Sequence, residues 1–222
     1  MDTSVLALIV ADLPDEGTTM SSSIETPDWS TIPAPADDGA ARHLLGITVP
    51  SVPLRATDGA TVDLFALAGL VVVYAYPRTG IPGVDNPKGW DQIPGARGCS
   101  PQSCSFRDHF RELKAEGVGH LFGLSTQDSA YQAEAASRLH LPFPILSDEH
   151  LALAGALRLP TFETSGMILL NRLTLVIKDG VIEHVFYPVF PPDRNASEVL
   201  AWLSARAGRP KPVRQYGNGG TV

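Results

Sequence analysis

The sequence lacks the features that mark nucleic-acid-binding, membrane and disulfide-stabilised proteins. Its 222 residues include 17 Lys and Arg against 24 Asp and Glu, for a formal net charge of −7. This balance argues against nucleic acid or an anionic membrane surface as a partner. No apolar run reaches the ~20 residues of a membrane span, and two cysteines are too few for the disulfide scaffold of a small secreted protein. We therefore expect a cytoplasmic protein whose thiols are reduced.

Composition sets the two ends of the chain apart from its centre. Residues 1–42 are rich in Thr, Ser, Pro, Asp and Ala and show little periodicity, while Gly and Pro dominate residues 208–222. These compositions predict a disordered or loosely packed N-terminal arm and a flexible C-terminal tail. Residues 43–207 contain the periodic segments and are predicted to form one domain.

The central region alternates between segments typical of strands and segments typical of helices. Residues 71–76 form a continuous apolar, β-branched run, which predicts a strand buried on both faces. Asp58-Gly59 and Asp179-Gly180 are hairpin turn signals. The predicted order, β-α-β-α-β followed by a hairpin and a helix, is that of a three-layer α/β sandwich with a mixed central sheet. The other predicted elements are strands at 120–125, 143–146, 167–170, 173–177 and 181–186, and helices at 126–140, 149–157 and from 195 onwards.

Both cysteines lie in a segment with the signals of a helix start. Ser100 suits the N-cap, with Pro101 at the first helical position. One apolar face and a helix stop then follow, formed by Phe106, Phe110, Leu113 and Gly117. The pattern places Cys99 at or just before a helix N-terminus and Cys104 at least one turn inside.

This placement has consequences for the chemistry of the two thiols. Unpaired backbone N–H groups and the helix dipole favour an anion at Cys99, and the thiolate is the reactive form of cysteine. Five positions along a helix rise ~7.5 Å and turn the second side chain away, whereas a disulfide needs Cα atoms within about 7 Å. A bond between Cys99 and Cys104 therefore predicts unwinding of the first helical turns.

The segment Gly98–Asp108, Gly-Cys-Ser-Pro-Gln-Ser-Cys-Ser-Phe-Arg-Asp, resembles the active-site segment of peroxiredoxins. It is most similar to the Q-type, or bacterioferritin-comigratory-protein, group, in which a resolving cysteine follows the peroxidatic cysteine by five residues. The resemblance covers residues from about 45 to 203 and implies a thioredoxin-like fold. It also implies a thiol-dependent peroxidase for hydrogen peroxide or organic hydroperoxides, with no metal or other cofactor. A thioredoxin-like or glutaredoxin-like protein would be the reductant, and the enzyme would be a monomer or homodimer.

The resemblance also implies roles for single residues. Cys99 would attack the peroxide and become a sulfenic acid, and Cys104 would condense with it to a disulfide. Arg172 precedes the predicted strand 173–177 and matches by context an arginine that reaches the peroxidatic sulfur. Backbone N–H groups of Gly98 and Cys99 are candidate donors to the negative charge that develops during the reaction.

Two features depart from the family pattern. Ala96 stands where the family has a threonine whose hydroxyl positions the peroxide, and we expect Thr79 or Ser100 to supply that hydroxyl. The link from residue 78 to residue 98, with five Gly and three Pro, is much longer than the family's. We expect it to fold over the cysteine site, because long loops in compact domains are often functional. The alternative is a surface insertion without a role.

Other functions remain open at this point. A thiol-disulfide oxidoreductase of the thioredoxin type normally has two residues between its cysteines, whereas four separate Cys99 and Cys104. Metal binding by these cysteines and His109 would leave the fourth ligand missing, and their spacing on a helix points them in different directions. A non-catalytic binding module with a thioredoxin fold is a further alternative, because Ala96 interrupts the family motif.

Overall fold

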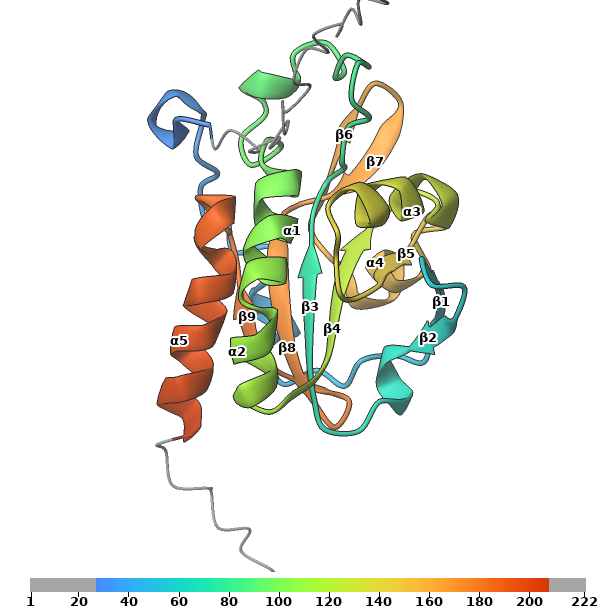
Figure 1. The fold of residues 1–222 in the computed structure, drawn as a ribbon, viewed down its shortest axis with the longest axis vertical. Helices are drawn as coiled ribbons and strands as arrows, with labels where there is room; N and C mark the ends of the chain where they lie inside the picture. Colours follow the sequence, from blue (N-terminus) through green and yellow to red (C-terminus); the bar gives the residue numbers. More distant parts are fainter. Residues whose placement is uncertain (1–26, 208–222) are drawn as a thin grey trace, which may run out of the picture.

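A seven-stranded mixed sheet forms the centre of the protein (Figure 1). The computed structural model describes residues 27–207. The strand order is β2-β1-β5-β4-β3-β8-β9, with β3, β4 and β5 parallel to one another and the remaining pairs antiparallel. The strands are β1 Pro53–Ala56, β2 Thr61–Asp63, β3 Leu70–Ala75, β4 Val118–Ser125, β5 Ile145–Ser147, β8 Leu173–Lys178 and β9 Val181–Phe186.

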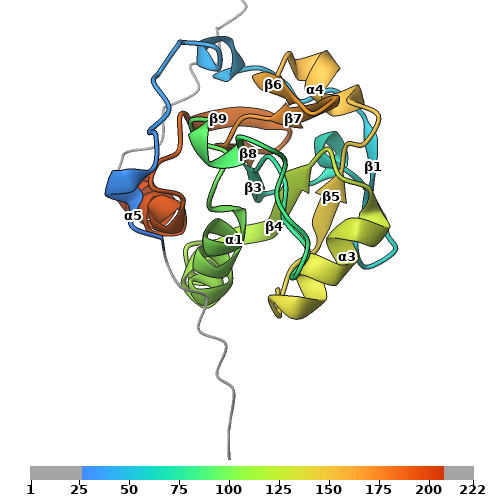
Figure 2. The same ribbon diagram turned by 90° about the horizontal axis from the view of Figure 1, so that it is seen from above.

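Helices cover both faces of this sheet and complete three layers. Figure 2 shows α1, α3 and α5 on one side and α4 on the other. Within residues 27–207, every helix is too short or too polar to cross a membrane. The helices are α1 Cys99–Asp108, α2 Phe110–Ala115, α3 Ser129–Arg138, α4 Ala152–Leu157 and α5 Asn195–Ala207. The architecture confirms the predicted α/β sandwich with a mixed sheet.

The alternation of side chains along β3 divides the hydrophobic core in two. Val72 and Tyr74 pack on the α1 and α5 side, together with Phe106 and Val199. Val71, Val73 and Ala75 point to the other side, where α4 packs. All six residues of β3 are buried, as expected for a central strand covered on both faces.

The two Asp-Gly turn signals correctly predicted both hairpins of the main sheet. Asp58-Gly59 joins β1 to β2, and Asp179-Gly180 joins β8 to β9. A separate two-stranded sheet, β6 Thr161–Thr164 with β7 Met167–Leu170, lies outside the main sheet. The sequence indicated only its second strand, because Thr161–Thr164 is short and has no apolar alternation of its own.

The helix that carries the cysteines starts two residues earlier than the capping pattern predicted. Gly98, not Ser100, is the N-cap of α1, with φ +98° and no side-chain capping bond. Its carbonyl accepts the first helical hydrogen bond, from the Gln102 N–H at 3.0 Å. Glycine adopts a positive φ at low cost, which suits Gly98 for the N-cap position. Ser100 therefore lies in the first turn of α1 and does not cap it. The helix predicted from Ser100 towards Gly117 is also interrupted at His109, which separates α1 from α2.

The predicted N-terminal arm does not extend to residue 42. Residues 1–26 lie outside the described part of the chain, but residues 27–42 pack on the domain. The Trp29 indole N–H donates to Asp193 at 2.9 Å, and its ring meets Phe190 edge to face. Ala41 is buried in the core. These contacts link residues far apart in sequence, which composition does not reveal. Residues 208–222, the predicted tail, also lie outside the described part.

Candidate functional site

Cys99 occupies the first position of α1, where its thiol is nearly buried. Its side chain is 6% exposed, and Sγ lies 3.5 Å from the carbonyl oxygen of Ala96. Arg172 Nη2 lies 3.3 Å from the same sulfur. The sequence prediction of a cysteine at a helix start beside an arginine is therefore confirmed in its geometry. A fixed guanidinium at this distance stabilises negative charge on sulfur.

Arg172 is held in place by several acceptors from the turn before α1. It lies just before β8 and is 3% exposed. Nη2 points at the carbonyl oxygens of Gly95, Ala96 and Arg97, at 3.2, 3.3 and 3.0 Å. Among residues 27–207 no carboxylate forms an ion pair with this guanidinium, so its charge faces these carbonyl oxygens and the Cys99 sulfur.

A buried chain of polar side chains fixes the other side of the guanidinium. Arg172 Nη1 donates to the Gln102 side-chain oxygen. Gln102 Nε2 donates in turn to Asn195 Oδ1 at 2.9 Å, and that oxygen also accepts from the Thr174 hydroxyl at 2.6 Å. The chain ties α1 to β8 and to the start of α5. Sequence reasoning missed all three members of this chain, Gln102, Asn195 and Thr174, although Gln102 lies within the cysteine motif and was a visible candidate.

Gly98 fits its position only because it has no side chain. A Cβ atom here would come within 2.3 Å of Pro192 Cγ and 2.7 Å of the Trp29 ring. Both neighbours are bulky, and φ is in the left-handed region. The predicted backbone donor at Gly98 is thus held in one conformation by residues from both ends of the described chain.

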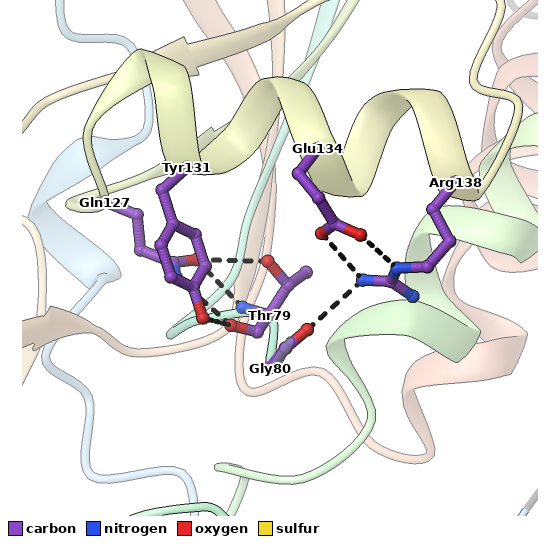
Figure 3. A network of polar contacts seen from close by, with 6 residues as sticks. All are labelled: Thr79, Gly80, Gln127, Tyr131, Glu134 and Arg138. Atoms are coloured by element: carbon purple, nitrogen blue, oxygen red, sulfur yellow. Dashed lines mark hydrogen bonds and ion pairs between the residues drawn. The ribbon is translucent and has the colours of Figure 1, made fainter. Parts of the chain in front are cut away.

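Thr79 is anchored to α3 and its N-terminal loop by a compact polar network (Figure 3). The Thr79 N–H donates to Gln127 Oε1 at 2.8 Å, and its hydroxyl is 3.3 Å from the same oxygen. The carbonyl of Thr79 accepts from Gln127 Nε2 at 3.1 Å and from the Tyr131 hydroxyl at 3.0 Å. One residue on, the carbonyl of Gly80 accepts from Arg138 at 3.1 Å, while Arg138 is also paired with Glu134. The start of the long loop is thereby fixed.

The loop from residue 78 to residue 98 forms the walls of a cavity at Cys99. The cavity has a volume of about 320 Å³. Four of the predicted site residues line it together: Thr79, Gly98, Cys99 and Ser100. The prediction that the loop folds over the cysteine is confirmed by its contribution to the lining, which includes Ile81, Pro82, Val84, Asn86 and Trp90.

Cys104 differs from Cys99 in that it is not among the residues that line this cavity. Both thiols are free and α1 is continuous between them. Burial raises the pKa of Cys104, an effect that the nearby Arg107 partly opposes. The two sulfurs therefore cannot meet while α1 keeps its first turns. His109 does not join them in a metal site, since residues 27–207 hold no group of three or more His, Cys, Asp or Glu able to bind a metal ion.

Comparisons with known proteins agree with this geometry. The redoxin family model matches residues 44–201. Peroxiredoxin Q, chloroplastic, of Oryza sativa subsp. japonica is 28% identical over 190 residues, which are 83% of this chain and 80% of that protein. The Triticum aestivum protein of the same name is 29% identical over 179 residues, covering 78% of this chain and 75% of its own.

Solved structures extend the comparison to the fold. Peroxidoxin BcpB from Mycobacterium tuberculosis has a TM-score of 0.59 at 27% identity, covering 75% of this chain and 98% of the other. Peroxiredoxin Q from Xanthomonas campestris has a TM-score of 0.58 at 23% identity, covering 73% and 96%. The sheet and the helix that carries the cysteines are thus arranged as in known thioredoxin-like structures.

Proposed function

The chain belongs to the redoxin family and is a Q-type peroxiredoxin, a thiol-dependent peroxidase, and we propose that Cys99 is its peroxidatic and Cys104 its resolving cysteine. The observation that carries these assignments is the position of Cys99: its sulfur lies 3.3 Å from Arg172 Nη2 and lines the cavity walled by the loop. Cys104, on the same helix, does not line that cavity.

In the first step the Cys99 thiolate attacks the terminal oxygen of the hydroperoxide. An S–O bond forms as the O–O bond breaks, the sulfur is oxidised to a sulfenic acid, and the peroxide leaves as an alkoxide or hydroxide that takes up a proton. Arg172 and the backbone N–H groups at the start of α1 stabilise the negative charge as it moves from sulfur to oxygen. Gln102 serves as a positioning residue, because it fixes the guanidinium.

In the second step the Cys104 thiol attacks the sulfenic sulfur, and water leaves as the disulfide forms. The first turns of α1 unwind for this step, since an intact helix holds the two side chains apart. A dithiol reductant of the thioredoxin type then restores both thiols by exchange and becomes a disulfide itself. A glutaredoxin-like protein is the alternative reductant.

The hydroxyl that positions the peroxide comes from Thr79 or Ser100 in this proposal. Both line the cavity with Cys99, whereas the side chain of Ala96, which also lines it, has no hydroxyl. The Thr79 hydroxyl donates to Gln127, which leaves its lone pairs to accept a hydrogen bond from the peroxide. Thr79 is the stronger candidate, because its backbone is fixed on both sides.

We further propose that the protein works in a reducing compartment such as the cytoplasm, as a monomer or homodimer, without nucleic acid or membrane as a partner. Its free thiols and its net charge of −7 support this proposal. Light scattering on the reduced and oxidised protein, together with fractionation of the cells that make it, measures these properties directly.

The test of the two assignments is peroxide turnover with a thioredoxin system. We expect Cys99→Ser to lose turnover by at least about 1,000-fold, as expected when a nucleophile is removed. Cys104→Ser should instead react once, at the wild-type rate of thiol oxidation, and then stall. A Cys99→Ser protein that still turns over peroxide would contradict the assignment. A Cys104→Ser protein with full turnover would transfer the resolving role to another thiol.

A further inference from the structure

The cavity at Cys99 has a lining of one charge sign. Three arginines line it, Arg78, Arg97 and Arg138, and no Asp or Glu is among the described residues that form its lining. This stands out in a chain with a net charge of −7. A cavity lined by cations concentrates anions near its mouth and walls.

Two of these arginines are already paired with a carboxylate. Arg97 Nη1 lies 3.0 Å from Asp91 Oδ2, and Arg138 Nε lies 2.7 Å from Glu134 Oε1. Arg78 has no carboxylate within ion-pair distance among residues 27–207. Of the three arginines that line the cavity, Arg78 is therefore the one whose guanidinium is not paired with a carboxylate of the described residues.

Aromatic rings hold the Arg78 guanidinium in place. Its Cζ lies 5.9 Å from the centre of the Trp90 ring and 6.0 Å from that of Tyr131. Nη2 also donates to the Tyr131 hydroxyl at 3.1 Å. Stacked in this way, the guanidinium loses less freedom when it binds an anion, and its other N–H groups remain available as a planar fork for a carboxylate.

The remaining surroundings of Arg78 define where such an anion would lie. A neighbouring cavity that Arg78 also borders is lined by Asp128 and Glu149, which repel an anion from that side. On the Cys99 side the loop supplies the apolar groups Ile81, Pro82 and Val84. A volume of about 320 Å³ is within the range of small-molecule sites, ~300–1,000 Å³, and is far more than hydrogen peroxide fills.

We propose that Arg78 forms an anion subsite in the peroxide cavity, which selects organic hydroperoxides that carry a carboxylate. The inference rests on the proposed peroxidase function of Cys99. In the bound state the hydroperoxide group meets Cys99, the apolar body lies along the loop, and the carboxylate pairs with the guanidinium. The loop from residue 78 to residue 98 thus determines specificity as well as covering the thiol.

The test compares two substrates that differ only in charge. Cumene hydroperoxide with a carboxylate in the para position is matched with the corresponding primary amide. The ratio of their kcat/KM values, measured with the thioredoxin system, isolates the effect of the charge. We expect the wild type to favour the acid by about five- to tenfold at low salt, because hydrogen bonds to charged groups are stronger than those between neutral groups. This ratio should fall as salt is added.

Variants then assign the preference to one residue. Arg78→Gln should reduce the acid-to-amide ratio to about one, and Arg78→Lys should keep most of it. Arg111→Gln, an exposed position on α2, is the matched control and should leave the ratio unchanged. If Arg78→Gln does not fold, the salt dependence of the wild-type ratio decides in its place.

The outcomes separate this inference from the proposed function. Consumption of neither substrate would mean that the peroxidase assignment itself fails. Consumption of both at equal rates, or a ratio that Arg78→Gln leaves unchanged, would overturn the anion subsite while the peroxidase assignment stands. A ratio above one that disappears with the Arg78 charge supports the subsite.

Discussion

The two cysteines share one helix but differ in almost everything around them. Cys99 lies at the first position of α1, borders a cavity, and has a guanidinium 3.3 Å from its sulfur. Cys104 lies one and a half turns further on, does not border that cavity, and has its pKa raised by burial. In the proposed mechanism this difference sets an order of reaction: Cys99 reacts with peroxide in the folded state, and Cys104 reacts once α1 has opened.

The largest effect on this contrast should come from the cation beside Cys99. We expect Arg172→Met to slow the oxidation of Cys99 by roughly 100-fold, the usual effect of removing one preorganised donor. Arg172→Lys retains the charge but not the planar fork of donors, so its oxidation rate should lie between those of the wild type and Arg172→Met. Stopped-flow fluorescence measures the oxidation rate, and circular dichroism checks folding. An Arg172→Met protein with the wild-type rate would show that helix position alone activates Cys99.

The next effect concerns the packing that holds the Cys99 end of α1. Gly98→Ala should destabilise the protein by about 2–4 kcal/mol, since the new Cβ meets Pro192 and Trp29 and the backbone is left-handed. Gly46→Ala is the control: its φ is +78°, but its Cβ would meet no atom within 4 Å, so we expect about 1 kcal/mol. Urea denaturation measures both. Equal losses of stability in the two variants would mean that the packing of Pro192 and Trp29 against Gly98 does not determine the cost of a side chain there.

The other side of the contrast is the protection of Cys104. In a Cys99→Ser protein we expect iodoacetamide to modify folded Cys104 about tenfold more slowly at pH 8 than Cys104 unfolded in urea, because burial keeps the thiol protonated and covered. Equal rates in the two states would contradict a withheld resolving thiol.

The raised pKa of Cys104 also predicts how the opening of α1 depends on pH. Since the pKa of Cys104 is raised in the folded state, its contribution to stability is complete below the ordinary thiol pKa. That contribution is lost as pH rises through the folded value. Opening of α1, followed by hydrogen exchange corrected for intrinsic rates, should therefore become easier in alkaline solution. In Cys104→Ser this dependence should be absent.

The smallest effect should come from the hydroxyl that positions the peroxide. We expect Thr79→Val to lower the oxidation rate of Cys99 by about tenfold, as for a lost hydrogen bond in the transition state, while Thr79→Ser retains the rate. Ser100→Ala is the matched variant. An unchanged rate in Thr79→Val with a reduced rate in Ser100→Ala would assign the role to Ser100.

How much of this the sequence could predict depends on the range of the interactions. The buried run of β3, the two Asp-Gly hairpins and the placement of Cys99 at a helix start follow from residues close in sequence. The bond of Gln102 with Asn195, 93 residues away, does not. Nor do the contacts of Trp29 with Asp193 and of Thr79 with Gln127. The N-cap at Gly98 was missed because Ser100 and Pro101 also fit a capping pattern, and only the folded chain decides between the two helix starts.

The most direct measurement is a count of free thiols, with intact mass, after one equivalent of hydrogen peroxide. We predict that the wild type loses both thiols and the mass of two hydrogen atoms, as an intramolecular disulfide requires. Cys104→Ser should gain one oxygen, trapped as a sulfenic acid at Cys99. Thiols that survive peroxide in the wild type would contradict the account, and would mean that the cavity and the arginine beside Cys99 serve some other chemistry.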